Sequence, residues 1–150
     1  MKQTEIEIKE LKGHLAQMWS LVEQQVRKSF EAVVVFDQDL AHEIISREKS
    51  VNAQELVVDH HCENFIALFN PVAVDLRFVL SLLKINNNLE RIGDFAESIA
   101  LFTAHHQTKV IAPELLKQLQ LKKMFDTVLK MMDQARTALA REDSRLARPG

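Results

Sequence analysis

The sequence contains little that would interrupt long helices. Its 150 residues include only three glycines and three prolines, and tyrosine is absent. Folds made of many short strands need frequent turns, which glycine and proline usually supply, so this scarcity argues against them. We therefore expect an all-α protein whose long helices are joined by short connections.

Other absences narrow the class of protein. Cys62 is the single cysteine, which excludes an intrachain disulfide and fits a reducing compartment. No window approaches the roughly 18 uncharged apolar residues of a membrane span, and the N-terminus lacks the apolar core of a signal peptide. A formal charge of -2 gives no electrostatic case for nucleic-acid binding. These features predict a cytoplasmic protein that binds no nucleic acid.

Apolar residues recur at spacings of three and four along most of the chain, which is helical periodicity. The pattern predicts helices over about 4–36, 40–69 and 71–106, with Asp37 or Asp39 capping the second and Asn70-Pro71 ending it. Such short turns require antiparallel neighbours. The expected core stripe of the second helix is Leu40, Ile44, Ile45, Val51, Leu56, Val58, Cys62, Phe65, Ile66 and Phe69.

A fourth helix is expected from about 112–114 to Arg141, and it resembles the first. An offset of 106 positions aligns Leu15, Met18, Trp19 and Val22 with Leu121, Met124, Phe125 and Val128, and extends to Asp143-x-x-Leu146-Ala147. That spacing suits two tandem three-helix units. We expect one three-helix repeat over 1–110 and the first helix of an incomplete second repeat over 111–150. The chain is then a truncated two-repeat protein or a natural single-repeat form, and its fourth helix should pack on another element, such as a second subunit.

Two acids in the third helix attract attention. Glu90 and Asp94 lie four residues apart, in a polar stripe with Asn87 and Glu97, so their carboxylates stack one turn above the other. Hard cations take oxygen ligands, and helical bundles build metal sites from inward-facing carboxylates. Gly93 between the acids would permit close approach of a ligand or of another backbone. Glu90 and Asp94 are therefore candidate metal ligands.

A metal-free arrangement is also possible for this pair. Asp94 could pair with Arg91, three residues earlier, on a solvated face. Antiparallel pairing about Asn70-Pro71 places Asp94 near Ser46-Arg47 and Glu90 near Ser50-Val51. The nearest polar candidates from the second helix are then Glu43, Arg47, Glu48 and Asn52, and Arg47 could neutralise the acids in place of a cation.

Other polar groups support no chemistry of their own. His60-His61-Cys62-Glu63 resembles a zinc motif, but consecutive helical residues point about 100° apart and cannot converge on one ion. Asp75 and Arg77 could bind a partner or an anion, although an acid near a helix N-terminus is favourable without any function. Because no phosphate loop, nucleophile-base pair or HExxH motif is present, we expect no enzyme.

Several segments, in order, resemble the PhoU family of phosphate-uptake regulators. They are Asp37-Gln38-Asp39-Leu40-Ala41, Val51-Asn52-Ala53-Gln54-Glu55-Leu56, Pro71-Val72-Ala73-Val74-Asp75-Leu76-Arg77 and Leu89-Glu90-Arg91-Ile92-Gly93-Asp94-Phe95-Ala96. The resemblance implies a three-helix bundle with a metal-binding Glu/Asp-x-x-x-Asp motif, which maps onto Glu90 and Asp94. The ion could be iron, zinc, manganese, magnesium or nickel. The second repeat ends before its own copy of the motif.

The resemblance also implies a function. Members of the family are negative regulators of phosphate-regulon signalling, and connect the phosphate ABC transporter ATPase to a sensor histidine kinase. The chain would then be an adaptor that is a homodimer and reaches the membrane only through its partners. Two alternatives stay open: a carboxylate-bridged metalloenzyme or metal-storage bundle, and an accessory domain of a sodium-phosphate cotransporter.

Overall fold

Four long helices make up the described part of the protein. The structure is a computed structural model that describes residues 2–106, 115, 117 and 119–147. The helices are α1 (Gln3–Val35), α2 (Gln38–Phe69), α3 (Ala73–His105) and α5 (Leu121–Ala147). At 1.5 Å per residue, each of the first three is about 50 Å long. The all-α prediction is confirmed.

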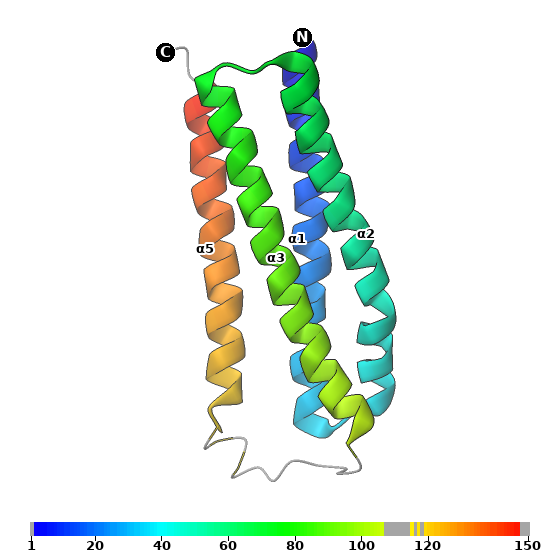
Figure 1. Ribbon diagram of the computed structural model, residues 1–150. Coiled ribbons are helices and arrows are strands. Elements are labelled where there is room, and N and C mark those ends of the chain that lie inside the picture. The colour runs from blue at the N-terminus through cyan, green and yellow to red at the C-terminus, as the bar shows by residue number, and fades with distance from the viewer. Residues whose placement is uncertain (1, 107–114, 116, 118, 148–150) are drawn as a thin grey trace.

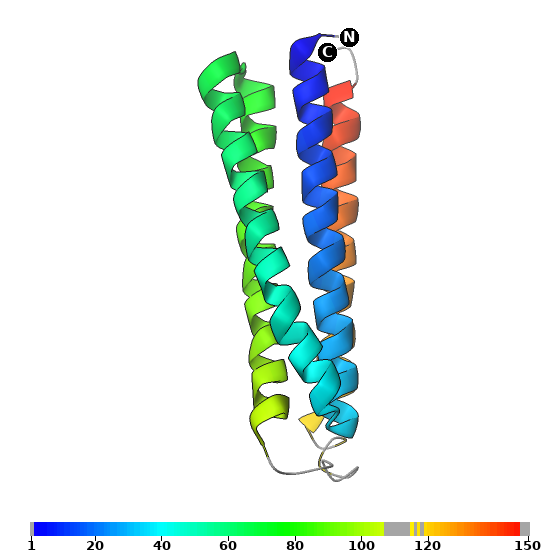
Figure 2. The ribbon, with the colours of Figure 1, turned by 90° about the vertical axis from the view of Figure 1, so that its right-hand side faces the viewer.

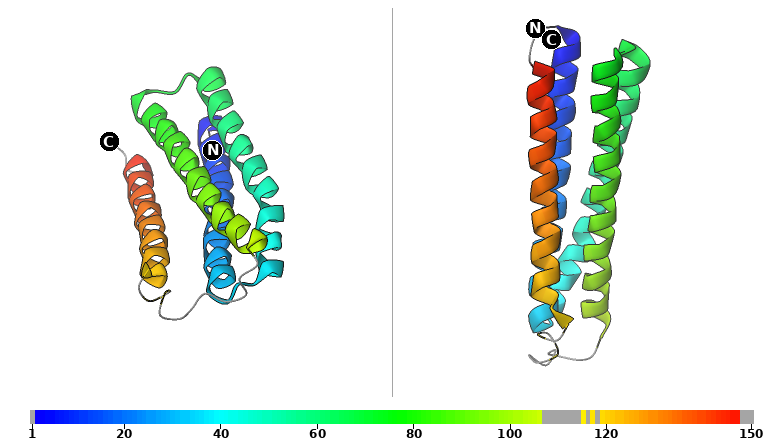
Figure 3. Two further views of the ribbon diagram at one scale, coloured as in Figure 1. Left: turned by 60° about the horizontal axis from the view of Figure 1, so that its bottom comes forward. Right: turned by 90° about the vertical axis from the view of Figure 1, so that its left-hand side faces the viewer.

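The helices α1, α2 and α3 form an antiparallel bundle, and α5 packs against its outside (Figure 1). In Figure 2, α1 and α5 lie side by side in one layer, and α2 and α3 form the other. Figure 3 shows α5 on the side of α1 away from α2. Arg136 of α5 joins the two helices of its layer, because its guanidinium lies 5.5 Å from the Trp19 ring centroid and 3.3 Å from Glu23 Oε2.

A main hydrophobic core fills most of the bundle, and a second, smaller cluster consists of Ala32, Ala41, Ile44 and Ala100. In α1, the buried apolar residues include Leu11, Leu15, Met18, Val22, Val26 and Val33. In α2, Val51, Val58, Cys62 and Phe65 face the same core. Leu56 was predicted there, which is wrong, because it is 53% exposed. Leu56 lies two residues before the buried Val58 in the helix. Its side chain therefore points about 200° away from that of Val58, toward solvent.

The two short connections end helices as the sequence indicated. Phe36 and Asn70 adopt left-handed backbone conformations at the C-caps of α1 and α2, with φ of 54° and 45°. Asn tolerates this conformation well, and Pro71 after it cannot extend the helix in register. Of the two candidate caps, Asp37 is the one used, since its Oδ1 accepts a hydrogen bond of 3.0 Å from Leu40 N.

Removing this cap should have a measurable cost. We expect Asp37→Ala to lower the free energy of unfolding by about 1 kcal/mol, because the first turn of α2 loses a side-chain acceptor. Asp39→Ala is the matched control, since Asp39 lies in the same turn and contributes only through the helix dipole. Urea unfolding followed by circular dichroism measures both. Equal losses in the two variants would contradict a specific role for Asp37.

The fourth helix differs from its predicted bounds. The predicted start at 112–114 lies outside the described residues, and α5 begins at Leu121, after Gln120 at φ 52°. The predicted end at Arg141 is wrong, because α5 continues to Ala147. No glycine or proline lies between Arg141 and Pro149, so nothing in 142–147 interrupts the helix. That 111–150 begins a second repeat stays a prediction.

None of the helices in the described ranges is long and apolar enough to cross a membrane.

Candidate metal centre

Six acids line the contact between α2 and α3, and we call them the acid seam. Glu48, Glu55 and Asp59 come from α2, at spacings of seven and four, and Glu90, Asp94 and Glu97 come from α3, at spacings of four and three. These spacings keep each set on one helical face. The α2–α3 connection turns the two faces toward each other, so Glu48 meets Asp94 and Glu97, and Glu55 meets Glu90.

Glu48 is the most unusual member of the seam. Its residue surface is only 4% exposed, and neither carboxylate oxygen has a hydrogen-bond partner. Burial raises its pKa to about 7, and the charges of Glu97 and Asp94 add to the rise. The nearby Gln25 side chain offsets part of this rise in pKa. Its amide nitrogen, however, already donates a hydrogen bond of 2.9 Å to Ile44 O. A buried carboxylate without a partner requires either a proton or a cation.

Gly93 of α3 lies beside the buried Glu48 carboxylate. A Cβ at Gly93 would lie 3.8 Å from both Glu48 oxygens and 3.4 Å from Val51 Cγ1. The helices therefore pack closely here, with the carboxylate lying over the glycine. A methyl group would be accommodated at these distances, so the role of Gly93 in making room beside the acids stays a prediction.

A second group of acids lies further along the seam. The pKa of Glu55 is raised to about 7, chiefly by burial. Its hydrogen bond with Asp59 and the negative charges of Asp59 and Glu90 add to the rise. Asn86 orders this group, because its amide nitrogen donates to Glu55 O at 3.0 Å and to Asp59 Oδ1 at 3.2 Å. The fully buried Asn86 carbonyl has no partner.

The structure places the predicted residues in different parts of the seam. Glu90 is half-buried beside Glu55, and Asp94 is more exposed beside Glu48. Of the four α2 candidates only Glu48 faces them. Glu55 and Asp59 were missed, although their spacing from Glu48 would have revealed the stripe. Asn87 was predicted for the stripe but is exposed, and its neighbour Asn86 lies inside.

The cationic competitors do not neutralise these acids. Arg47 pairs with Glu43 at 2.9 Å and reaches Gln24 of α1 at 3.5 Å, which directs it away from the seam. Among the described residues, no ion pair joins Arg91 to Asp94. The seam is therefore a concentration of negative charge without a basic partner in its own helices.

The oxygen donors and the unpaired Glu48 fit a hard cation. No three seam acids within the described ranges bring one oxygen each to within 4.8 Å of one another. Without a cation, the negative charges of these carboxylates repel one another and keep the oxygens apart. A bound cation would offset that repulsion and draw neighbouring carboxylates together. The residues available to hold it are Glu48, Asp94 and Glu97 in one group, and Glu55, Asp59 and Glu90 in the other.

The remaining candidates lie elsewhere. Asp75 is half-buried and Arg77 exposed, in the opening turns of α3. His60 and Glu63 are exposed, with His60 Nδ1 3.8 Å from Glu63 Oε2, whereas Cys62 is buried and burial raises the pKa of its thiol to about 12. His61 instead contacts α1.

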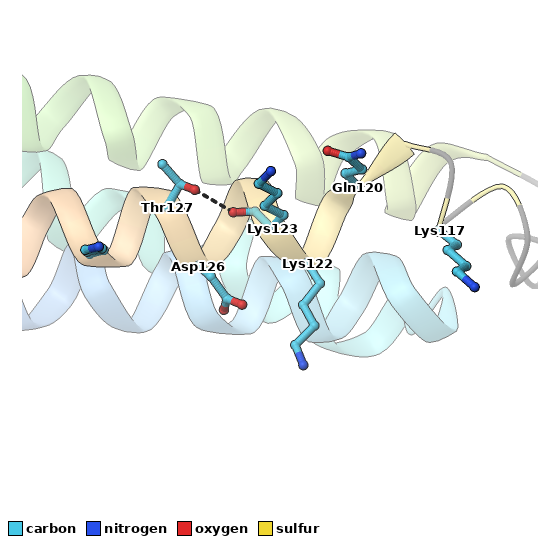
Figure 4. A pocket seen from close by; sticks show the side chains of 7 residues that line it. Lys117, Gln120, Lys122, Lys123, Asp126 and Thr127 are labelled. Atoms are coloured by element: carbon cyan, nitrogen blue, oxygen red, sulfur yellow. Dashed lines mark hydrogen bonds between the residues drawn. The ribbon is translucent and has the colours of Figure 1, made fainter.

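A hollow of about 510 Å³ opens at the start of α5, away from the seam. Its lining includes Lys117, Lys122, Lys123 and Lys130. Figure 4 shows Lys122 and Lys123 extending to opposite sides of the helix, and Thr127 Oγ1 donating to Lys123 O at 2.7 Å. Since these two ammonium groups diverge, they do not form one anion site.

The packing at Gly93 yields a stability prediction. We expect Gly93→Ala to leave the free energy of unfolding unchanged or to raise it by up to about 1 kcal/mol, because the new Cβ meets Val51 at an ordinary contact distance and alanine favours a helix. Gly93→Leu should cost about 1 to 3 kcal/mol through overpacking. Urea unfolding in a chelator tests both, and an equally tolerated leucine would contradict the close crossing.

Comparison with known proteins matches the same part of the chain. A family model described as the PhoU domain matches residues 15–103, from the first half of α1 to the last turn of α3. A protein of Archaeoglobus fulgidus named phosphate-specific transport system accessory protein PhoU homolog is 36% identical over 130 residues, or 85% of this chain and 63% of that protein. The Escherichia coli protein of the corresponding name is 32% identical over 127 residues, with coverages of 81% and 53%. The chain thus spans about half to three-fifths of these relatives.

Solved structures agree with this assignment. The crystal structure of PhoU from Pseudomonas aeruginosa is similar with a TM-score of 0.80 and 30% identity, over 97% of this chain and 68% of that one. The phosphate transport system regulatory protein PhoU from Streptococcus pneumoniae gives a TM-score of 0.74 and 25% identity, with coverages of 95% and 71%. With the domain match over more than half of its length, the chain belongs to the PhoU family.

Proposed function

We propose that this protein is a regulatory accessory protein of phosphate transport that acts by contact with other proteins. The observation that carries the proposal is the PhoU domain match over residues 15–103. That range contains most of the three-helix bundle and the whole acid seam. Relatives over this range are named phosphate-specific transport system accessory proteins. A negative regulatory role, between the phosphate ABC transporter ATPase and a sensor histidine kinase, is the specific form of the proposal.

In this proposal the acid seam binds a metal ion. Glu48, Asp94 and Glu97 would hold it beside Gly93, and Glu55, Asp59 and Glu90 could hold a second ion or enlarge the site. The cation would supply positive charge that lets buried carboxylates stay ionised, and it would join α2 to α3. Oxygen ligands favour magnesium, manganese or iron over softer ions such as zinc and nickel.

The proposed partner surface is the tip of the α2–α3 hairpin. Leu68, Val72 and Val74 are 77%, 70% and 55% exposed there, next to Asp75 and Arg77. Exposed apolar groups beside charged ones are characteristic of protein contact surfaces. The tip is thus the place where the predicted binding residues Asp75 and Arg77 would act.

Co-purification tests the proposed role. The tagged chain should retain the transporter ATPase or the histidine kinase from cells grown with ample phosphate. Arg77→Glu should reduce the retained amount, whereas Lys84→Glu, an exposed change further along α3, should not. Failure to retain either partner would contradict the adaptor role. If a chain that retained neither partner still bound metal at the acid seam, a metal-storage or metalloenzyme bundle would explain the protein better.

A homodimer in the cytoplasm completes the proposal. The outer face of α5 exposes Met124 and Met131, at 38% and 62%, and could pack on a second copy. Sedimentation of the purified chain would show a dimer, and Met131→Glu should shift it toward monomer.

A further inference from the structure

A group of possible metal ligands lies between α1 and α2, apart from the acid seam. His61 Nε2 of α2 lies 2.7 Å from Glu7 Oε2 and 3.9 Å from Glu10 Oε2 of α1. One ligand atom from each of the three residues lies within 4.8 Å of the others. His61 follows Asp59 by two positions and so points about 200° away from the seam. The group is independent of the residues used in the proposed function.

We propose that Glu7, Glu10 and His61 form a binding site for a borderline divalent cation such as Zn²⁺. One imidazole nitrogen and two carboxylate oxygens are a ligand set that zinc accepts, and three protein ligands leave a fourth position for water. The ion would connect the opening turns of α1 to the last third of α2.

The distances suit this coordination. Two ligands about 2.0 to 2.2 Å from a tetrahedral zinc ion are about 3.3 to 3.6 Å apart. The observed separations of 2.7 and 3.9 Å bracket that range. The Glu10 side chain is 57% exposed and can close the longer gap by changing rotamer. Zn²⁺ would replace the proton that now joins His61 Nε2 to Glu7, with no helix having to move far.

Neighbouring groups hold the first two ligands in place. Gln3 Nε2 donates to the other Glu7 oxygen at 3.1 Å, and the His14 ring packs edge-on against His61 with centroids 5.3 Å apart. Side chains of Glu7 and His61 are 21% and 16% exposed, which shields them partly from solvent. The hydrogen bond from His61 lowers the pKa of Glu7, so this carboxylate is ionised near neutral pH. Hydrogen bonds and packing around metal ligands commonly strengthen metal binding.

Zn²⁺ titration of the full chain tests this site. The titration uses the Glu90→Ala/Asp94→Ala background, to weaken binding at the seam, with calorimetry for affinity and ¹⁵N-histidine NMR for the ligand. We expect one equivalent of Zn²⁺ to bind and to shift the His61 imidazole signals. His61→Gln should weaken this binding at least tenfold. His60→Gln is the control, since His60 is the exposed neighbour, and it should leave binding unchanged.

A second variant guards against a folding defect in His61→Gln. Glu10→Gln keeps the short His61–Glu7 contact and changes an exposed side chain, yet it should also weaken Zn²⁺ binding about tenfold. His61 signals that do not respond to Zn²⁺ would overturn the proposal and leave the contact as an ion pair only. Equal Zn²⁺ affinity in the parent, Glu10→Gln and His61→Gln chains would overturn it too. Neither result bears on partner co-purification, which tests the proposed function separately.

Discussion

Replacing Glu48 with glutamine is expected to raise the free energy of unfolding of the metal-free protein at pH 8 by about 2 to 3 kcal/mol. Glu48 is buried without a hydrogen-bond partner, and its pKa is raised to about 7, chiefly by burial. At pH 8 the folded protein must hold this carboxylate in its charged form, which costs free energy. Glutamine has nearly the same shape and carries no charge, so it removes that cost.

The sign of the effect depends on pH. A raised pKa means that the unfolded chain loses its proton first, near pH 4.5, and the folded protein loses it only near pH 7. Stability should therefore fall as pH rises across this window and stay low above it. The advantage of Glu48→Gln should vanish below pH 4.5. The pKa of Glu55 is also raised to about 7, so the Glu48→Gln variant should still lose some stability as pH rises across the same window.

Urea unfolding from pH 4 to pH 8 in a chelator measures these curves. Glu43→Gln is the matched control on the same helix, because its hydrogen bond with Lys28 lowers the pKa of Glu43. That control should gain no stability at pH 8. A Glu48→Gln protein that is less stable than the parent at pH 8 would show that the buried carboxylate has a partner within the protein.

Truncating the buried ring of Phe65 is expected to cost about 3 to 5 kcal/mol in the free energy of unfolding. Phe65 is 1% exposed in the core shared by the three helices, and its ring stacks on Phe69 with centroids 5.4 Å apart. Phe65→Ala would leave a cavity that rigid helices cannot close. Leu68→Ala, one turn along at a 77% exposed site, should change stability by no more than about 0.5 kcal/mol.

Thermal and urea unfolding would compare these two variants. If Phe65→Ala lost no more stability than Leu68→Ala, the three helices would not share the core described above. A loss of stability accompanied by a smaller m value, the slope of the unfolding free energy against urea concentration, would indicate that the bundle no longer unfolds as a unit.

Much of the fold could be predicted because helical periodicity is a local signal. The bounds of the first three helices lie within two residues of those predicted, since Asp37 and Asn70-Pro71 mark the connections directly. The end of α5 could not be found in this way. The similarity of Asp143-x-x-Leu146-Ala147 to the first connection suggested a turn, but the residues themselves favour a helix, which α5 follows to Ala147.

The α3 side of the acid seam was also predictable, because Glu90, Asp94 and Glu97 show their shared face within one helix. The α2 side depends on how two helices pair. The sequence placed Glu90 opposite Ser50-Val51, whereas in the structure it meets Glu55, about one turn further along. Because α3 begins at Ala73 instead of Pro71, the pairing is displaced. The contact of His61 with Glu7 and Glu10 was missed for a related reason, since it joins residues far apart in sequence.

Metal content of the acid seam tests the central claim most directly. Equilibrium dialysis against Mn²⁺ would compare the His61→Gln protein, which lacks the second proposed site, with the same protein carrying Glu90→Ala and Asp94→Ala. Elemental analysis gives bound metal per chain, and circular dichroism confirms that both are folded. We predict at least one Mn²⁺ per chain in the first protein and at least tenfold weaker binding in the second. Equal metal content in the two would show that Glu90 and Asp94 bind no ion.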